Sequence, residues 1–99
     1  MWSVIKVGNT IGTEGSEGGK IIFDDEHSLG ARVTLEKDGD IAPFSITVGV
    51  YGSFFHTVYM SSLDESESML QSMKSDIDDY FKDPLKTETN WVESFVNRY

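Results

Sequence analysis

Between positions 30 and 81 the chain reads GARVTLEKDGDIAPFSITVGVYGSFFHTVYMSSLDESESMLQSMKSDIDDYF, and this stretch decides the fold. Its first part contains three runs in which apolar and polar side chains alternate, as is typical of strands with one buried face. These runs cover residues 31–36, 44–51 and 54–60. The apolar spacing then changes to that of a helix, with one stripe formed by Met69, Leu70, Met73, Ile77, Tyr80 and Phe81. The stretch therefore predicts an antiparallel sheet with a helix laid across it.

Two turn signals join these three strands. Asp38-Gly39 is typical of a two-residue hairpin because both residues tolerate positive φ, and Gly52-Ser53 suits a turn with Gly at its first central position. If each strand pair is centred on its dipeptide, the register follows, and with it the face on which each side chain lies. The face that we expect to form the core then carries Ala31, Val33, Leu35, Phe44, Ile46, Val48, Val50, Phe55, Thr57 and Tyr59.

Residues 2–7 and 20–24 are predicted to complete the sheet as its first two strands. Between them, residues 8–19 contain five glycines, and we expect a flexible loop there. The run Asp24-Asp25-Glu26-His27 offers metal-ligand chemistry, but neighbours on a strand point to opposite sides and cannot converge on one ion. We therefore interpret this run as a solvated acidic hairpin tip, and the sequence indicates neither a metal site nor a cofactor.

The long helix is predicted over residues 63–83. Ser62 can cap the amide of Glu65 while the Glu65 side chain returns to Ser62, which is a capping box. Pro84 ends the helix, because proline disfavours helical geometry in the residue before it.

A polar link at residues 84–90 leads to a short C-terminal helix that we expect Asn90 to open. Its Trp91 and Phe95 are interpreted as core residues that cover an edge of the sheet. The expected fold is a single α+β domain over residues 1–99. It consists of an antiparallel meander of four or five strands, one long amphipathic helix packed on one face, and the short C-terminal helix.

Composition narrows the class of protein. The chain has no cysteine, which excludes disulfides, thiolate nucleophiles and cysteine-containing metal sites. Its first residues do not resemble a signal peptide, and no apolar stretch approaches the ~20 residues that cross a bilayer. These features predict a cytoplasmic protein with no membrane contact.

The net charge limits the classes of partner that we expect. Seventeen acidic residues against eight basic ones give a formal net charge of −9. Nucleic acids and anionic membranes require clustered Lys or Arg, so we expect neither as a partner. The charge is compatible with a basic protein as partner, and the alternative is that it serves solubility alone.

The predicted register places a mixed apolar and polar patch on the sheet face opposite the helix, where a solvated face would be uniformly polar. Such a patch usually marks a contact surface. We expect a second copy of the chain to cover it, as in a homodimer. The alternatives are cover by the chain's own C-terminal helix, first strand or glycine-rich loop, and a small-molecule pocket. Its candidate binding residues are Arg32, Glu36, Tyr51, Phe54, His56, Val58 and Met60.

A catalytic or ligand-binding role would centre on His56. Gly49 lies across from His56 in the predicted register and leaves room for a pocket, and histidine is the usual general base near neutral pH. Glu36, Arg32 or Tyr51 would be its partners. A lone histidine on a sheet is more often a packed or solvated residue, so the sequence favours a non-catalytic protein.

The second candidate surface is the outer face of the long helix, where we expect Asp64, Glu67 and Asp78 to point away from the core. Such a face can complement a basic active site, as immunity proteins and nuclease inhibitors do, and this likeness is one of class only. The alternative, which is the more common role of such acids, is a solvated helix face that gives solubility. The function that the sequence favours is therefore a small acidic interaction domain. It either self-associates through its second sheet face or binds a basic protein partner.

Overall fold

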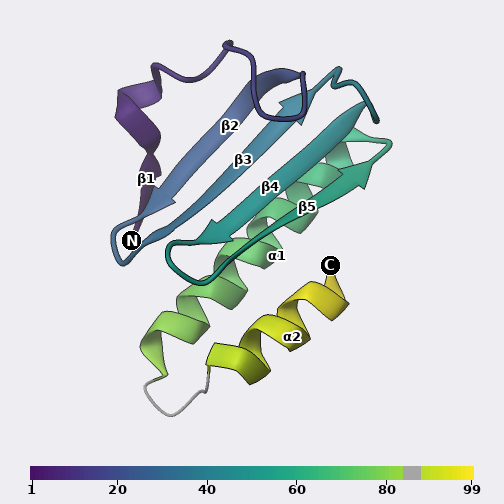
Figure 1. Cartoon of the computed structure of the whole chain (residues 1–99). Coiled ribbons are helices and arrows are strands. Elements are labelled where there is room, and N and C mark those ends of the chain that lie inside the picture. Colours follow the sequence, from purple (N-terminus) through teal and green to yellow (C-terminus); the bar gives the residue numbers. More distant parts are fainter. Residues whose placement is uncertain (84–87) are drawn as a thin grey trace.

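The computed structural model describes residues 1–83 and 88–99. It contains one antiparallel sheet in the strand order β1-β2-β3-β4-β5, with two helices on one side (Figure 1). The elements are β1 (Trp2–Val4), the 3₁₀ helix η1 (Ile5–Gly8), β2 (Lys20–His27), β3 (Ala31–Lys37), β4 (Phe44–Val50), β5 (Phe54–Met60), α1 (Leu63–Lys82) and α2 (Glu88–Arg98). The predicted α+β class, with a five-stranded meander, one long helix and one short one, is confirmed.

Helix α1 crosses behind the sheet, and its apolar stripe forms the core with β3 and β4 (Figure 1). Leu70, Met73 and Ile77 of this stripe are fully buried. The helix begins as predicted, since the Ser62 hydroxyl accepts a hydrogen bond from the Glu65 amide at 3.2 Å. No helix among residues 1–83 and 88–99 has the length and apolar character needed to cross a membrane.

Helix α2 extends the helical layer beside α1. Its Phe95 is buried, and the rings of Trp91 and Phe95 lie 5.8 Å and 5.6 Å from the ring of Phe54. The prediction that these two aromatic residues belong to the core is confirmed. The predicted helix start at Asn90 was wrong, because α2 already begins at Glu88. Of the predicted link at 84–90, residues 84–87 lie outside the described residues.

The loop between β3 and β4 is longer than the predicted two-residue turn. It spans residues 38–43 and is closed by a hydrogen bond of 2.8 Å from the Asp38 amide to the Pro43 carbonyl. Leu35 consequently pairs with Ile46, where the tight turn would have paired it with Ala42. This shift covers an even number of positions, so the predicted faces of β3 and β4 are correct although the register was wrong.

The turn between β4 and β5 changes the faces. It contains three residues, 51–53, with Gly52 at a φ of 77° and a hydrogen bond of 3.0 Å from the Ser53 amide to the Val50 carbonyl. Val48 therefore pairs with His56, and the shift by one residue reverses the two sides of β5. The residues that face the helices are Phe54, His56, Val58 and Met60, and those on the opposite face are Phe55, Thr57 and Tyr59.

The first two strands also differ from the prediction. β1 ends at Val4 and η1 begins at Ile5, whereas β2 continues to His27. Asp24-Asp25-Glu26-His27 is thus the end of a strand and not a hairpin tip. Its side chains alternate between the two faces: Asp25 pairs with Lys74 of α1, whereas Asp24 pairs with Arg32 on the other side of the sheet. Among the described residues, no group of three or more His, Asp and Glu side chains is arranged to hold a metal ion.

Candidate functional site

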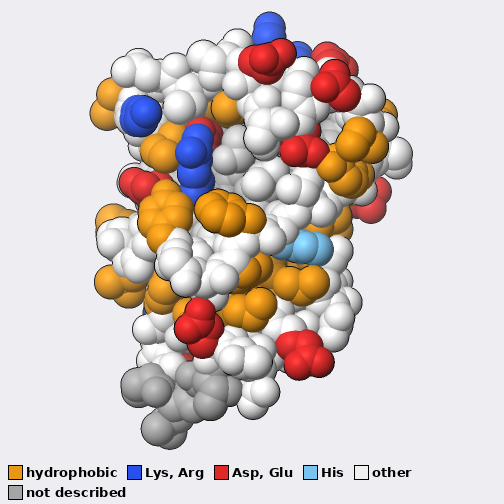
Figure 2. Space-filling model, viewed as in Figure 1, with side chains coloured by type: hydrophobic (Ala, Val, Ile, Leu, Met, Phe, Trp, Pro, Cys, Tyr) orange, Lys and Arg blue, Asp and Glu red, His pale blue; other side chains and the backbone are white. Residues whose placement is uncertain are grey.

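The face of the sheet turned away from α1 is the candidate site, and we call it the open face. Its residues include Ile21, Asp24, Glu26, Arg32, Thr34, Glu36, Ser45, Thr47, Gly49, Phe55, Thr57 and Tyr59. Figure 2 shows this face, with apolar side chains gathered across its middle and acidic side chains around them. Tyr51, in the turn after β4, lies at its rim.

A buried ion pair organises one end of the open face. Arg32 donates two hydrogen bonds to Asp24, from Nε at 2.8 Å and from Nη2 at 2.7 Å, and the Thr34 hydroxyl donates a third at 3.0 Å. Burial alone would raise the pKa of the Asp24 carboxyl, but the hydrogen bonds, above all that from Arg32, hold it below its ordinary value of 3.8. The Asp24 side chain is completely buried, whereas 38% of the Arg32 side chain remains exposed. The guanidinium is therefore held in one orientation and still accessible.

Glu36 anchors the glycine-rich loop at the other end. Its carboxylate is buried and accepts hydrogen bonds from the Gly19 amide at 3.1 Å and the Glu17 amide at 3.2 Å. The loop approaches so closely that a Cβ on Gly15 would lie 2.2 Å from the Glu36 Cδ. A larger residue there would displace the Glu36 carboxylate, so this glycine serves close packing of the loop on the sheet. Glu36 thus acts as a structural anchor for the loop, and it also lines the cavity beneath it.

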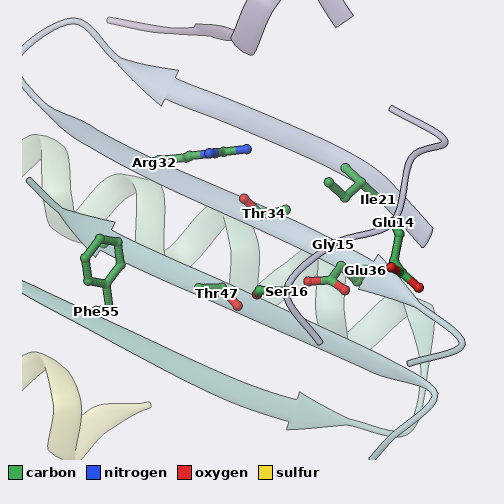
Figure 3. Close-up of a pocket in the computed structure, with 10 residues that line it drawn as sticks. Glu14, Gly15, Ser16, Ile21, Arg32, Thr34, Glu36, Thr47 and Phe55 are labelled. Atoms are coloured by element: carbon green, nitrogen blue, oxygen red, sulfur yellow. The ribbon is translucent and has the colours of Figure 1, made fainter. Parts of the chain in front are cut away.

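A cavity of about 450 Å³ lies between this loop and the sheet. Thr34 and Thr47 line it from the sheet, Glu14 and Ser16 from the loop, and Arg32 and Phe55 lie toward the opposite end (Figure 3). The lining offers hydroxyls, one guanidinium, carboxylates and an aromatic ring. Such groups can bind and orient a polar or cationic side chain.

Three aromatic side chains give the open face its apolar area. Phe55 is 75% exposed and lies over Gly49, where a Cβ would come within 2.6 Å of the ring. The Tyr51 hydroxyl donates to Glu26 at 2.6 Å, and burial together with this hydrogen bond raises the pKa of Tyr51 to about 12. The Tyr59 hydroxyl donates to Glu17. Acidic partners thus hold both tyrosines, and each ring remains more than 40% exposed.

The structure divides the seven predicted binding residues between the two faces. Arg32 and Glu36 lie on the open face and Tyr51 at its rim, as expected. The placement of Phe54, His56, Val58 and Met60 on this face was wrong, because the three-residue turn directs them toward the helices. Phe54 and Val58 pack against the core, and Met60 belongs to it. The chain's own helices therefore cover the side chains for which we expected a second copy.

The predicted pocket around His56 and Gly49 is not formed by these two residues together. Gly49 lines the cavity on the open face, whereas His56 pairs with the core residue Val48 and lies on the side of the helices. His56 is consequently separated from Glu36 and Arg32 by the sheet itself. The predicted grouping of a general base with these partners was wrong.

The acidic face of α1 is smaller than predicted. Asp64 and Glu67 are exposed, as expected. Asp78 instead lies toward the sheet, where its Oδ1 is 2.9 Å from the Nε2 of the buried His27. The outward orientation predicted for Asp78 was wrong, because β2 reaches farther than expected and brings His27 under the helix.

Sequence reasoning missed several residues of the open face, among them Asp24, Glu26, Phe55, Thr57 and Tyr59. Asp24 and Glu26 were assigned to a hairpin tip because the acidic run conceals the continuation of β2 to His27. Phe55 was assigned to the core through the assumed length of the turn before it.

No family model, no curated protein and no solved structure matches this chain. The argument about function therefore rests on the geometry of the site.

Proposed function

We propose that this protein is a non-catalytic interaction domain that binds a basic protein partner through the open face of its sheet. The observation that carries the proposal is the position of exposed Phe55 and Tyr51 beside the oriented, partly exposed Arg32, with the exposed Tyr59 farther along β5. Aromatic residues and arginine are the side chains that dominate binding energy at protein interfaces. An aromatic ring that is 75% exposed on a small domain is also unusual unless something packs against it.

Charge supports a basic partner. Glu14, Glu17 and Glu26 lie around the aromatic group, and Arg32 is already neutralised by Asp24. The open face is therefore acidic, and the formal charge of the whole chain is −9. Lysine and arginine side chains of a partner would be attracted to the acidic groups and could stack on Phe55.

The same charges disfavour a second copy on this face, because two acidic rims would then meet. A catalytic role has less support as well. Among the described residues, the open face carries hydroxyls, carboxylates and one guanidinium but no histidine, since His27 and His56 both lie on the other side. The lack of cysteine is consistent with a cytoplasmic setting, which we include in the proposal.

Affinity capture with matched variants tests the proposal. The wild-type chain, Phe55→Asp on the open face and Glu67→Lys on α1 are used as baits against an extract of the native host. We expect a basic protein that the wild type and Glu67→Lys retain and that Phe55→Asp loses. A partner that Phe55→Asp retains and Glu67→Lys loses would transfer the binding surface to α1 and overturn the proposal.

A further inference from the structure

The two edges of the sheet differ in how they are protected. β1 has only three residues, and the chain leaves it through η1, where Lys6 and Val7 adopt positive φ values of 47° and 48°. This edge is therefore short and interrupted. β5, the other edge, has seven residues and pairs with β4 at every position without a bulge.

β5 also lacks the usual safeguards of an edge strand. Natural proteins protect such edges with lysine, proline, a bulge or a covering segment, because the unpaired backbone groups otherwise recruit another strand. The sequence of β5, FFHTVYM, contains no proline and no Lys, Arg, Asp or Glu. Among the described residues, the backbone of β5 forms its strand hydrogen bonds with β4 alone, and its other edge pairs with no strand. The outer edge is thus available to a further strand.

Helix α2 supplies a floor for such a strand. It lies beyond β5 on the helical side of the sheet, with its inner aromatic residues on Phe54 (Figure 1). A groove of about 560 Å³ lies between α2 and Ser53, in the turn that precedes β5. Val92 and Val96 give this groove apolar area, and Glu88 and Glu93 give it negative charge.

We propose that the free edge of β5 takes an extended segment of the basic partner as an additional strand. Apolar side chains on one face of the segment would pack on Val92 and Val96, and lysine or arginine side chains would approach Glu88 and Glu93. Backbone hydrogen bonds would supply affinity and the groove would supply selectivity, as is general for strand addition. The inference rests on the proposed function for the nature of the partner, but it concerns a different surface.

A synthetic probe tests the edge without the partner. The probe is an acetylated nine-residue peptide of alternating valine and lysine. One control peptide has proline at its centre, and a second has glutamate in place of lysine. We expect the valine-lysine peptide to shift the backbone amide resonances of β5 and to slow their hydrogen exchange, while those of β1 stay unchanged. Both control peptides should bind at least about tenfold more weakly, because proline removes a backbone donor and glutamate reverses the charge.

Protein variants separate the effect of the charges in the groove on peptide binding from the effect of the net charge of the chain. The double variant Glu88→Lys/Glu93→Lys reverses the charge of the groove. The double variant Asp64→Lys/Glu67→Lys makes the same change of charge on the outer face of α1. The first double variant should weaken peptide binding about fivefold or more and the second less than about twofold, given the usual size of exposed charge pairs. Circular dichroism checks that both variants keep their helices.

Three outcomes would overturn the inference. The peptide could shift the resonances of β1 or of the open face in place of those of β5, or the two double variants could lose the same amount of peptide affinity. The third is that the free chain sediments as a dimer and its β5 amides are protected from hydrogen exchange. The last would make a second copy the occupant. Failure of the peptide test leaves the proposed function standing if capture still depends on Phe55. Conversely, if the peptide binds at β5 and capture of the partner does not depend on Phe55, the proposed function is wrong and the inference about the β5 edge stands.

Discussion

The neighbours Phe54 and Phe55 provide a matched test of how β5 is oriented. Phe54 packs edge-on against Trp91 and Phe95, whereas Phe55 is 75% exposed. Truncation of a buried Phe to Ala costs about 3–5 kcal/mol, and because Phe54 is only partly buried we expect about 2–3 kcal/mol for Phe54→Ala. Only a quarter of Phe55 is buried, and burial of a whole Phe side chain is worth about 1.5–3 kcal/mol, so Phe55→Ala should cost about 0.5 kcal/mol.

Urea denaturation, followed by circular dichroism and tryptophan fluorescence, measures both free energies of unfolding. The expected difference of about 2 kcal/mol corresponds to roughly 10 °C in Tm for a domain of this size. A two-residue turn at Gly52-Ser53 would exchange the roles of the two phenylalanines. Equal costs, or a larger cost for Phe55→Ala, would therefore refute the orientation of β5 and the open face built on it.

Three further predictions concern the core, the buried ion pair and the surface charge. Leu70→Ala and Met73→Ala should each lower the free energy of unfolding by about 2–4 kcal/mol in the same denaturation assay, and losses below about 0.5 kcal/mol would mean that α1 is not packed there. The depressed pKa of Asp24 means that its pairing with Arg32 stabilises the fold fully above about pH 3.8, and this contribution is lost as the pH falls through the lower folded-state pKa. Asp24→Asn should therefore flatten the acid side of the stability profile measured by thermal melting, and an unchanged acid side would contradict the role of the pair. Fluorescence anisotropy with labelled duplex DNA should show no binding at physiological salt, whereas binding that weakens steeply with added salt would contradict our reading of the charge.

Alternation and helical spacing were sufficient to predict the architecture. The period-two runs of β3 and β4 assigned both faces correctly even though the loop at residues 38–43 was four residues longer than expected. Side-chain direction depends only on whether the shift is even or odd, which makes the face a more robust prediction than the register. The capped apolar stripe of α1 was predictable because both of its signals are local.

The orientation of β5 was not predicted because it depended on one residue in a turn. The sequence does contain the opposing signal: Phe54, Val58 and Met60 form a more apolar set than Phe55, Thr57 and Tyr59. Hydrophobicity along the strand was therefore a better guide to its buried side than the assumed turn length.

The cavity lay beyond sequence reasoning because its walls are joined by long-range contacts. Glycine-rich stretches indicate conformational freedom, and nothing local in residues 14–19 indicates that their amides bind the Glu36 carboxylate. The pairing of Asp24 with Arg32 likewise requires the true end of β2, which the acidic run concealed.

The central claim is that the open face is the binding surface. Titration calorimetry with the captured basic partner tests this claim most directly. The wild-type chain and two variants are the ligands. Phe55→Ala truncates an exposed side chain on the open face, and Glu67→Gln neutralises an exposed side chain on α1. Removal of an interface aromatic of this kind costs about 2 kcal/mol, so Phe55→Ala should raise Kd about 30-fold while Glu67→Gln changes it less than about twofold. A Kd that is unchanged in Phe55→Ala but raised in Glu67→Gln would contradict the account.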